Sequence, residues 1–362
     1  MRICYIGDAR SVHMQRWALW FGKKHEVVLV RTVADEALPE VPGPALPATG
    51  RLPGQRLARS VSALRGVLRS TRVDILHAHF INEAGWFAAA SRFRPYVLTV
   101  WGSDVYQAPK VWPGALLNRW AARLADHVTC DSRDQAKRIE EWGVRPERVS
   151  VVGWGIDTAS FRPGLDRSRW RRRLGIPPDA PVVFSPRQWV PNSNIEVVVA
   201  AHARLSEDVY LLLKRLPRFE GPHAKHVQRT VEESPARSRI RTVSYVPEDE
   251  LPGLYAAADC LVTLCGTDGT PVSVLEGMGI GLPVVALGIP SLREWVAEPG
   301  GLLCASLDPA GVAAALRNFV DSPAARQRAA EHNVNQIAAR ACREHEMGRI
   351  EALYERLHRG NV

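Results

Sequence analysis

The stretch TDGTPVSVLEGMGIGLPVVA, residues 267–286, is the strongest indication of the fold. The apolar run Cys260–Leu264 before it predicts a buried strand, and the chain then turns at Asp268 and Gly269. Val272–Met278 predicts the first turns of a helix. The N-terminus of such a helix offers free N–H groups and the positive end of its dipole, which suit a diphosphate.

Two acidic residues of this stretch, Asp268 and Glu276, lie eight positions apart. Their carboxylates cannot serve a phosphate, but they can accept hydrogen bonds from sugar hydroxyl groups. The spacing alone also fits a helix cap at Asp268 and a solvated Glu276, because acidic residues are common near helix starts. Both interpretations stay open at this point.

On either side of this stretch, short apolar runs alternate with helical patterns in two consecutive series. One helical pattern is formed by Leu57, Val61, Leu64 and Leu68, and others cover Ile195–Leu205 and Leu251–Ala257. Alternation of strand and helix predicts an α/β protein with two Rossmann-like, doubly wound parallel sheets, which bind ligands at the carboxyl ends of their strands. The predicted strands are Ile3–Ile6, Val27–Val30, Ile75–His77, Tyr96–Val100 and His127–Cys130, then Val182–Ser185, Val209–Leu213, Ile240–Val243, Cys260–Leu264, Val284–Ala286 and Leu302–Cys304.

The length of 362 residues suits two domains, which we place at residues 1–165 and 166–340. Residues 341–362 should form a final helix that returns to the first domain, with an apolar stripe of Ile350, Leu353, Tyr354 and Leu357. Residues 35–54, with five prolines, predict a loop, and residues 158–180 predict the connection between the domains.

Composition narrows the class of protein. With 46% hydrophobic and 23% charged residues, no apolar stretch of membrane-spanning length and no signal peptide pattern at the start, we expect a cytoplasmic protein. No cysteine pair has C-x-x-C spacing, so we expect neither a zinc site nor a redox pair. All six cysteines should be reduced thiols: Cys4, Cys130, Cys260, Cys265, Cys304 and Cys342.

The net charge of +9 is uneven. Residues 1–165 hold 23 Lys and Arg against 15 Asp and Glu, a balance of +8, and the rest holds 24 against 23, a balance of +1. A basic first half fits an anionic partner such as a phosphorylated acceptor or the inner face of a membrane, and equally an arginine-rich solvated surface. The helix predicted over residues 55–70 carries Arg56, Arg59, Arg65 and Arg69. No nucleic-acid-binding motif accompanies the charge, so we expect no nucleic acid partner.

The 267–286 stretch closely resembles the E-x7-E signature of the retaining glycosyltransferases of family 4, which have the GT-B fold of two Rossmann-like domains facing a cleft. Asp stands at the first acidic position. The resemblance implies that Asp268 contacts the donor sugar and Glu276 the nucleotide ribose. It also implies a donor site lined by Gly269, Thr270, Pro271, Val272 and Val246.

Five other segments resemble family motifs and occur in the family's order. They are DILHAHF (74–80), TVWGSDVY (99–106), ADHVTCDS (125–132), GIDTASFRP (155–163) and PSLREWV (290–296). The resemblance therefore extends over nearly the whole chain.

The second domain departs from the family pattern at one cation. The family grips the diphosphate with an Arg and a later Lys, and in SPRQWVPNSN (185–194) Arg187 fits the first position. No Lys follows, because Asn192 or Ser193 stands in its place. Lys214, after the run VYLLL, either replaces it or is a solvated surface residue.

The first domain departs at Trp101, which replaces the family's His and can only stack on a ring. Asp104 keeps a carboxylate nearby, and the loop GDARSVHMQRW offers Arg10, His13 and Arg16. We place Arg10, Arg16, Trp101 and Asp104 in the acceptor site or cleft, and His13 with Arg187, Asp268 and Lys214 in the catalytic set. We predict that His77 and His79 point to opposite faces of their strand and pack or cap turns instead of sharing a metal.

The resemblance implies an enzyme that transfers a hexose-type sugar with retention from a UDP- or GDP-linked donor to a hydroxyl acceptor: a small molecule, a glycan or a lipid-linked glycan. We expect no cofactor and no metal, because cationic groups can stabilise the leaving diphosphate and no D-x-D motif is present. A non-catalytic nucleotide-sugar-binding scaffold and a nucleotide-sugar epimerase of the same fold stay open, as does peripheral membrane association.

Overall fold

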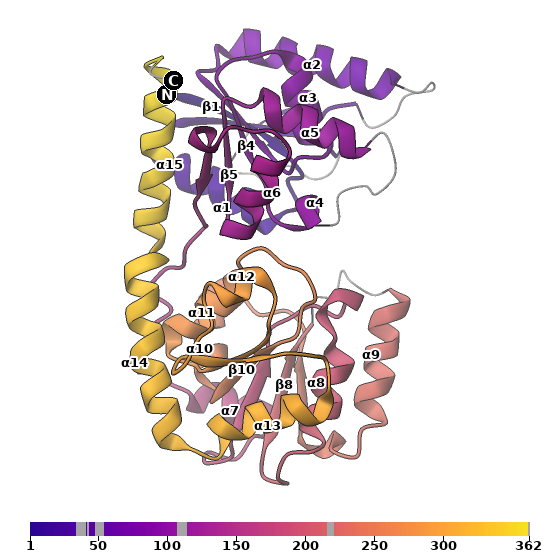
Figure 1. Ribbon diagram of the computed structural model, residues 1–362, viewed down its shortest axis with the longest axis vertical. Helices are drawn as coiled ribbons and strands as arrows, with labels where there is room; N and C mark the ends of the chain where they lie inside the picture. Colours follow the sequence, from indigo (N-terminus) through magenta and orange to yellow (C-terminus); the bar gives the residue numbers. More distant parts are fainter. Residues whose placement is uncertain (34–40, 42, 48–53, 107–113, 216–220, 361–362) are drawn as a thin grey trace. The chain divides into compact units, whose positions relative to one another are not determined.

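A computed structural model describes residues 1–33, 41, 43–47, 54–106, 114–215 and 221–360. The chain forms two compact units (Figure 1). The first unit consists of Met1–Trp154 together with Met347–Val362, and the second of Gly155–Glu346. Most of the predicted loop 35–54 lies outside the described residues.

The first unit contains a parallel six-stranded sheet in the order β2-β1-β3-β4-β5-β6. All five strands predicted for it are confirmed. The sixth strand, β6, was missed because it has only three residues, all half-buried at the edge of the sheet, and so shows no apolar run. The strands are β1 (Arg2–Gly7), β2 (Glu26–Arg31), β3 (Ile75–His79), β4 (Tyr96–Thr99), β5 (His127–Cys130) and β6 (Val149–Val151).

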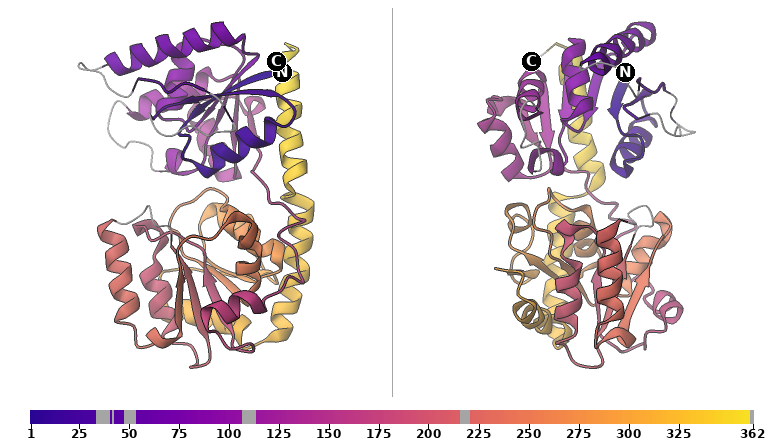
Figure 2. Two further views of the ribbon diagram at one scale, coloured as in Figure 1. Left: turned by 180° about the vertical axis from the view of Figure 1, so that it is seen from behind. Right: turned by 90° about the vertical axis from the view of Figure 1, so that its right-hand side faces the viewer.

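Helices flank both faces of this sheet, as the views of Figure 2 show. One face is aliphatic and packs against α2, α3, α5 and α6, of which α2, α3 and α5 lie side by side. The other face is aromatic and packs against α1 and the final helix, α15. The helices are α1 (Val12–Phe21), α2 (Gln55–Thr71), α3 (Glu83–Ser91), α4 (Ser103–Tyr106), α5 (Gly114–Leu124), α6 (Arg133–Glu141) and α15 (Arg343–His358).

The final helix returns to the first unit, as predicted. Its Tyr354 hydroxyl lies 3.2 Å from that of Tyr5 on β1, and Lys24 pairs with Glu351 at 2.9 Å. All four residues of the predicted stripe are buried: Ile350, Leu353, Tyr354 and Leu357.

The second unit repeats the plan with a parallel sheet in the order β12-β11-β10-β7-β8-β9. All six predicted strands are confirmed: β7 (Val182–Ser185), β8 (Tyr210–Lys214), β9 (Ile240–Val243), β10 (Cys260–Thr263), β11 (Val284–Leu287) and β12 (Gly301–Cys304). One face packs against α8 (Ile195–His202), α9 (Pro222–Glu232) and α13 (Pro309–Val320). The other packs against α7 (Ser168–Leu174), α10 (Leu251–Ala256), α11 (Val272–Ile280), α12 (Pro290–Arg293) and α14 (Pro323–Arg340).

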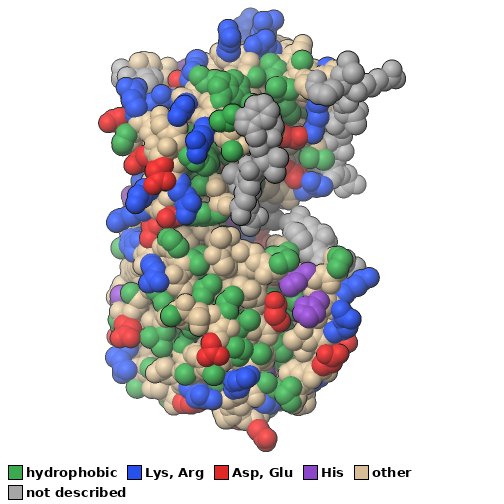
Figure 3. Space-filling view, turned by 45° about the vertical axis from the view of Figure 1, so that its right-hand side comes forward, with side chains coloured by type: hydrophobic (Ala, Val, Ile, Leu, Met, Phe, Trp, Pro, Cys, Tyr) green, Lys and Arg blue, Asp and Glu red, His purple; other side chains and the backbone are tan. Residues whose placement is uncertain are grey.

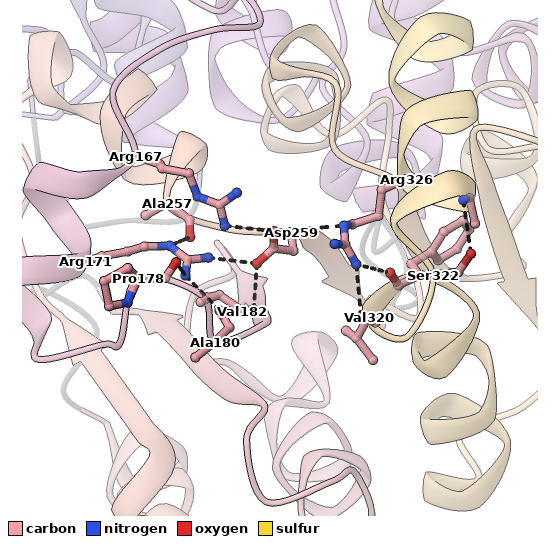
Figure 4. A network of polar contacts seen from close by, with 12 residues as sticks. Arg167, Arg171, Pro178, Ala180, Val182, Ala257, Asp259, Val320, Ser322 and Arg326 are labelled. Atoms are coloured by element: carbon pink, nitrogen blue, oxygen red, sulfur yellow. Dashed lines mark hydrogen bonds and ion pairs between the residues drawn. The ribbon is translucent and has the colours of Figure 1, made fainter.

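A buried charge network fixes the connecting segment to this sheet (Figure 4). Asp259, just before β10, accepts hydrogen bonds from Arg167 and Arg171 of the connection, both at 2.8 Å, and from the Val182 N–H at 2.9 Å. Arg171 is 2% exposed and also donates to the carbonyl oxygens of Ala257 and Ala180. The network lies at the amino ends of β7 and β10. It therefore stabilises the end of the sheet opposite to the carboxyl ends of the strands.

All six cysteines lie within the described residues and are free thiols. No helix in the described part of the chain is both long enough and apolar enough to cross a bilayer.

Candidate donor and acceptor sites

The carboxyl ends of two neighbouring strands of the second unit bring Arg187 and Asp268 together. Arg187 follows β7, Asp268 follows β10, and their side chains form an ion pair with Nη2 and Oδ2 2.5 Å apart. Burial alone would lower the pKa of the Arg187 guanidinium, but the Asp268 carboxylate outweighs it and raises that pKa. Arg187 is therefore a permanent cation, and its Nε–H has no hydrogen-bond partner in the described part of the chain.

Asn192, one of the two residues considered at the position of the expected Lys, holds the loop after β10 in place. Its amide donates to the Thr267 carbonyl at 2.7 Å and accepts from the Thr267 N–H at 3.0 Å. Its own carbonyl accepts the Gly266 N–H at 3.0 Å. This residue thus positions the segment before Asp268, a role that no local sequence pattern indicates.

Helix α11 begins directly after this loop, with Pro271 as its N-cap. The first N–H groups that donate within the helix are those of Val274 and Leu275. The N–H groups of Val272 and Ser273 therefore have no acceptor within the helix. Two residues in or just after α12 hold the turn that precedes α11. The Ser291 hydroxyl donates to the Asp268 carbonyl at 2.9 Å, and the Trp295 indole donates to the Thr270 hydroxyl at 3.1 Å.

Glu276 lies inside α11 and is 5% exposed. The Tyr255 hydroxyl on α10 donates to its Oε2 at 2.9 Å, which orients the carboxylate. The glycines that follow let the helix pack closely, because a methyl group on Gly279 would lie 2.9 Å from the Phe161 carbonyl oxygen. Gly281 then ends the helix at φ 93°, a backbone conformation that favours glycine.

Lys214 lies at the end of β8, and Val246 lies just after β9. Lys214 is the last residue of β8, which pairs with β7, so it stands at the same sheet edge as Arg187. Val246 follows β9 and is 7% exposed. The structure thus places the predicted donor residues at the carboxyl edge of one sheet.

The first unit holds the other predicted residues around an aromatic cluster. His13 on α1 stacks on Trp101 after β4, with ring centroids 4.7 Å apart, and Trp101 stacks in turn on His79 at 5.7 Å. The prediction that His77 and His79 point to opposite faces is wrong, since their rings lie 4.5 Å apart. Residues two apart in a strand share a face.

The packing role predicted for His77 is confirmed. Its Nε2 bonds to the Thr99 hydroxyl at 2.6 Å, and its Nδ1 bonds to Tyr354. Burial lowers the pKa of His77 well below its usual range, so the ring is neutral.

Three further predicted residues lie close in the sequence to members of this cluster: Asp104, Arg10 and Arg16. Asp104 is buried and accepts the N–H groups of Ile81, Trp101 and Gly102, each at 3.0 Å, so its carboxylate shapes the loop that carries Trp101. Burial raises the pKa of Asp104. Arg10 pairs with Asp8 at 2.8 Å, and Arg16 lies on α1, one turn beyond His13.

Comparison with known proteins decides the family. Residues 11–160 match the description Glycosyltransferase Family 4, and residues 166–336 match Glycosyl transferases group 1. The chain belongs to the family 4 glycosyltransferases of the group 1 type.

Similar proteins agree with this assignment. This family 4 glycosyltransferase is 29% identical over 316 residues to a D-inositol 3-phosphate glycosyltransferase of Streptosporangium roseum, covering 80% of this chain and 72% of that protein. Its fold resembles that of HepE from Anabaena, solved in complex with UDP (TM-score 0.85, 18% identity, 99% of this chain and 100% of that one). Sucrose-phosphate synthase from Thermosynechococcus elongatus is equally similar (TM-score 0.85, 19% identity, 99% and 100%).

The fold of this glycosyltransferase is therefore GT-B, and its activity is sugar transfer from a nucleotide-sugar donor. Sequence reasoning missed Asn192, Tyr255, Ser291 and Trp295 as site residues. Each acts across a long sequence distance, so only the PSLREWV resemblance, which contains Ser291 and Trp295, could have drawn attention to two of them.

Proposed function

We propose that this glycosyltransferase transfers a hexose-type sugar from UDP to a hydroxyl acceptor, with retention of anomeric configuration and without a divalent metal. The observation that supports this most is the Arg187–Asp268 pair beside the N-terminus of α11. It sets one cation, one carboxylate and free helix N–H groups at one sheet edge, which suits a sugar joined to a diphosphate.

In the proposed reaction, the bond between the anomeric carbon and the diphosphate oxygen breaks, and its electron pair leaves with UDP. The acceptor oxygen forms the new bond to that carbon, and its proton passes to the leaving phosphate oxygen in a front-side attack. A double displacement would give the same configuration. Arg187 and the α11 N–H groups would stabilise the charge that grows on the leaving group, with Lys214 as a second cation.

The remaining donor contacts follow the family assignment. Asp268 would accept from a sugar hydroxyl, and Glu276, oriented by Tyr255, would accept from the ribose. Gly269, Thr270 and Val272 would line the donor site with Val246, and Pro271 would only shape the loop because it has no N–H. UDP is favoured over GDP since HepE, of the same fold, was solved with UDP.

We propose the acceptor role for the first domain, residues 1–165, and the donor role for residues 166–340, with residues 341–362 as the returning helix. Trp101 would stack on the acceptor, and His13, Arg10 and Arg16 would contact the acceptor or the departing phosphate. The curated relatives named D-inositol 3-phosphate glycosyltransferases favour a cyclitol as acceptor.

The basic first half also suggests peripheral association with an anionic membrane, but two of the arginines on α2 are bound within the protein. Arg56 on α2 pairs with Glu83, and Arg65 donates to the carbonyls of Ser91 and Ala90, so both are bound to α3. On the face of the first unit seen in Figure 3, Lys and Arg side chains are scattered among acidic and hydrophobic ones. Sedimentation with anionic vesicles at low salt tests it, and an unbound protein would reject it.

The decisive experiment is donor turnover by the full chain with UDP- and GDP-linked hexoses, with and without EDTA. We expect slow hydrolysis of a UDP-hexose that EDTA leaves unchanged, and NMR of the first-formed product should show the donor's own anomer. As a control, Asn318→Ala on the exposed side of α13 should turn over donor as the wild type does.

Other outcomes identify the alternatives. Binding of UDP-sugar without any turnover, with or without acceptors, would point to a scaffold, consistent with Asn192 or Ser193 in place of the family's Lys. A free sugar inverted at C2 would point to an epimerase. Loss of turnover in EDTA would contradict the metal-independent route.

A further inference from the structure

The turn before α11, residues 268–271, depends on bonds from outside the helix. Pro271 is the N-cap of α11 and makes no side-chain capping bond, since its ring has no acceptor for the first N–H groups of the helix. The Asp268 carboxylate is paired with Arg187. The conformation of the turn is therefore set by side chains of other segments.

Trp295 supplies one of these bonds. Its indole N–H donates to the Thr270 hydroxyl at 3.1 Å. Trp295 is 8% exposed and Thr270 is 6% exposed, so water has little access to either group. A buried N–H that loses its acceptor is left unpaired at a considerable cost in free energy. The bond therefore favours a single position of Thr270 in the middle of the turn.

The Trp295 ring is itself held by the end of α14. It belongs to the same hydrophobic cluster as Ile337 and Ala341. The guanidinium of Arg340, the last residue of α14, lies over the ring at 4.3 Å from its centroid, where a cation is attracted to the aromatic face. The ring thus connects the end of α14 to the turn before α11.

The turn lies on the sugar side of the proposed donor site. The proposed function assigns Asp268, where the turn begins, to the donor sugar, and it assigns Glu276, inside α11, to the ribose. The Glu276 carboxylate is oriented by a separate residue, Tyr255 on α10, at 2.9 Å. A looser turn should therefore weaken contacts with the sugar and leave the contact with the ribose in place.

We propose that Trp295 is a positioning residue that sets the affinity for the sugar part of the donor. Its N–H holds Thr270, and Arg340 holds its ring, so both residues act through the turn and neither contacts the donor. This inference rests on the proposed function in one respect, that Asp268 and the turn after it contact the donor sugar.

Calorimetric titration of the full chain with UDP and with UDP-glucose tests the role of Trp295. Trp295→Phe removes the N–H and keeps an aromatic ring. It should weaken UDP-glucose about fivefold and change the affinity for UDP by less than about twofold. A residue with a purely structural role would lower the Tm and leave the ratio of the two affinities unchanged. An unchanged ratio in Trp295→Phe would overturn the proposal.

A double-mutant cycle tests whether Trp295 acts through Thr270. Thr270→Val removes the acceptor at nearly constant volume, and Thr270→Ser should recover most of the affinity for UDP-glucose that Thr270→Val loses. Trp295→Phe combined with Thr270→Val should weaken UDP-glucose no more than the stronger single change, because both remove the same bond. Effects that multiply would contradict the proposal. If Trp295→Phe fails to fold, wild-type affinity in Thr270→Val would still overturn it.

Arg340→Ala tests the support of the ring and should weaken UDP-glucose about twofold to threefold. Arg173→Ala is the matched control, because it removes a guanidinium that lies 4.6 Å from the centroid of the Trp170 ring on α7. It should lower the Tm to a similar degree and leave the affinity for UDP-glucose unchanged. Equal weakening by the two arginine variants would assign the effect to general stability and contradict the role of Arg340.

Hydrogen exchange without ligand separates this inference from the proposed function. Peptides covering residues 267–275 should lose protection in Trp295→Phe and keep it in Arg173→Ala. If UDP-hexose is turned over but Trp295→Phe neither loosens these peptides nor weakens UDP-glucose, the inference fails and the proposed function stands. If these peptides are loosened but the wild-type chain turns over no donor, the proposed function fails and the positioning of the turn by Trp295 stands.

Discussion

Arg187 and Asp268 neutralise each other across 2.5 Å, so each substitution changes what the other presents to a ligand. Arg187→Ala should lower kcat about a hundredfold, since one such contact in the transition state contributes about 3 kcal/mol. Arg187→Lys keeps the charge without the planar fork and should recover only part of the rate. Asp268→Asn should be milder than Asp268→Ala, because an amide still bonds a hydroxyl. Steady-state kinetics checks this, and an Arg187→Ala enzyme with wild-type kcat would contradict it.

In the proposed function, Glu276 contacts the ribose and Tyr255 positions its carboxylate. Because a ribose contact would exist in both the ground and the transition state, Glu276→Ala should raise the donor KM more than it lowers kcat. Tyr255→Phe removes only the hydroxyl that holds the carboxylate and should shift KM in the same direction by a smaller factor. A purely structural role would instead lower the Tm and leave KM unchanged, so both are measured.

Substitution of Lys214 tests whether this residue, at the end of the neighbouring strand β8, replaces the Lys that the family has at the position of Asn192 or Ser193. Lys214→Ala should weaken donor binding and lower kcat severalfold if its ammonium reaches the diphosphate, and Lys214→Arg should restore part of both. Asn192→Ala serves as the comparison, because it loosens the loop at Thr267 without removing a charge. Unchanged affinity and kcat in Lys214→Ala would leave helix N–H groups, or Arg10 and Arg16, as the partners of the second charge.

At the scale of single elements, the sequence predicted strands better than contacts. Buried strands of parallel sheets are continuous apolar runs, which made β1 and β10 recognisable, whereas β6 is short and half-exposed. Two candidate site residues in the segments that follow strands, Arg187 and Asp268, could be placed at the carboxyl ends of the sheet from topology alone. The bonds from Tyr255 to Glu276 and from Trp295 to Thr270 join distant segments, and no pattern within either segment reveals them.

The element α7 depends on one buried carboxylate. Asp259→Ala would leave Arg171, 2% exposed, without its ionic partner, and loss of one partner of a buried pair costs about 3–5 kcal/mol. Glu250→Gln is the matched control, because it breaks the exposed pairs of Arg169 and Arg173 with the same region and should cost about 1 kcal/mol or less. Urea unfolding of both variants measures the difference, and equal costs would show that the Asp259 network adds nothing beyond surface pairing.

At the scale of the whole molecule, buried neutral histidines should make the first unit more sensitive to acid than the second. Burial lowers the pKa of His13 and His127 to about 4 and that of His79 to about 3, and it lowers that of His77 well below the usual histidine range. In the second unit, His202 is lowered to about 4.

The folded protein should lose stability as the pH falls, because the unfolded chain then binds more protons than the folded one. Between the ordinary histidine value of 6.5 and the folded values, the unfolded chain binds protons that the folded chain does not. Stability is therefore full above about pH 6.5 and falls by about 1.4 kcal/mol per pH unit for each such histidine as the pH drops. These four histidines of the first unit, together with His25, whose pKa burial also lowers, predict a steeper loss there than the single one of the second.

Hydrogen exchange of the full chain at pH 7.5, 6.0 and 5.0, corrected for the intrinsic pH dependence of exchange, separates the two units. Peptides from β1 and β3 should lose protection before those from β7 and β10, since most carboxylates titrate only at lower pH. His127→Gln, which can keep a bond to Ser150, should reduce the acid sensitivity of the first unit by about one proton's share. Equal loss in both units, or none between pH 7.5 and 5.0, would mean that these rings become protonated without unfolding.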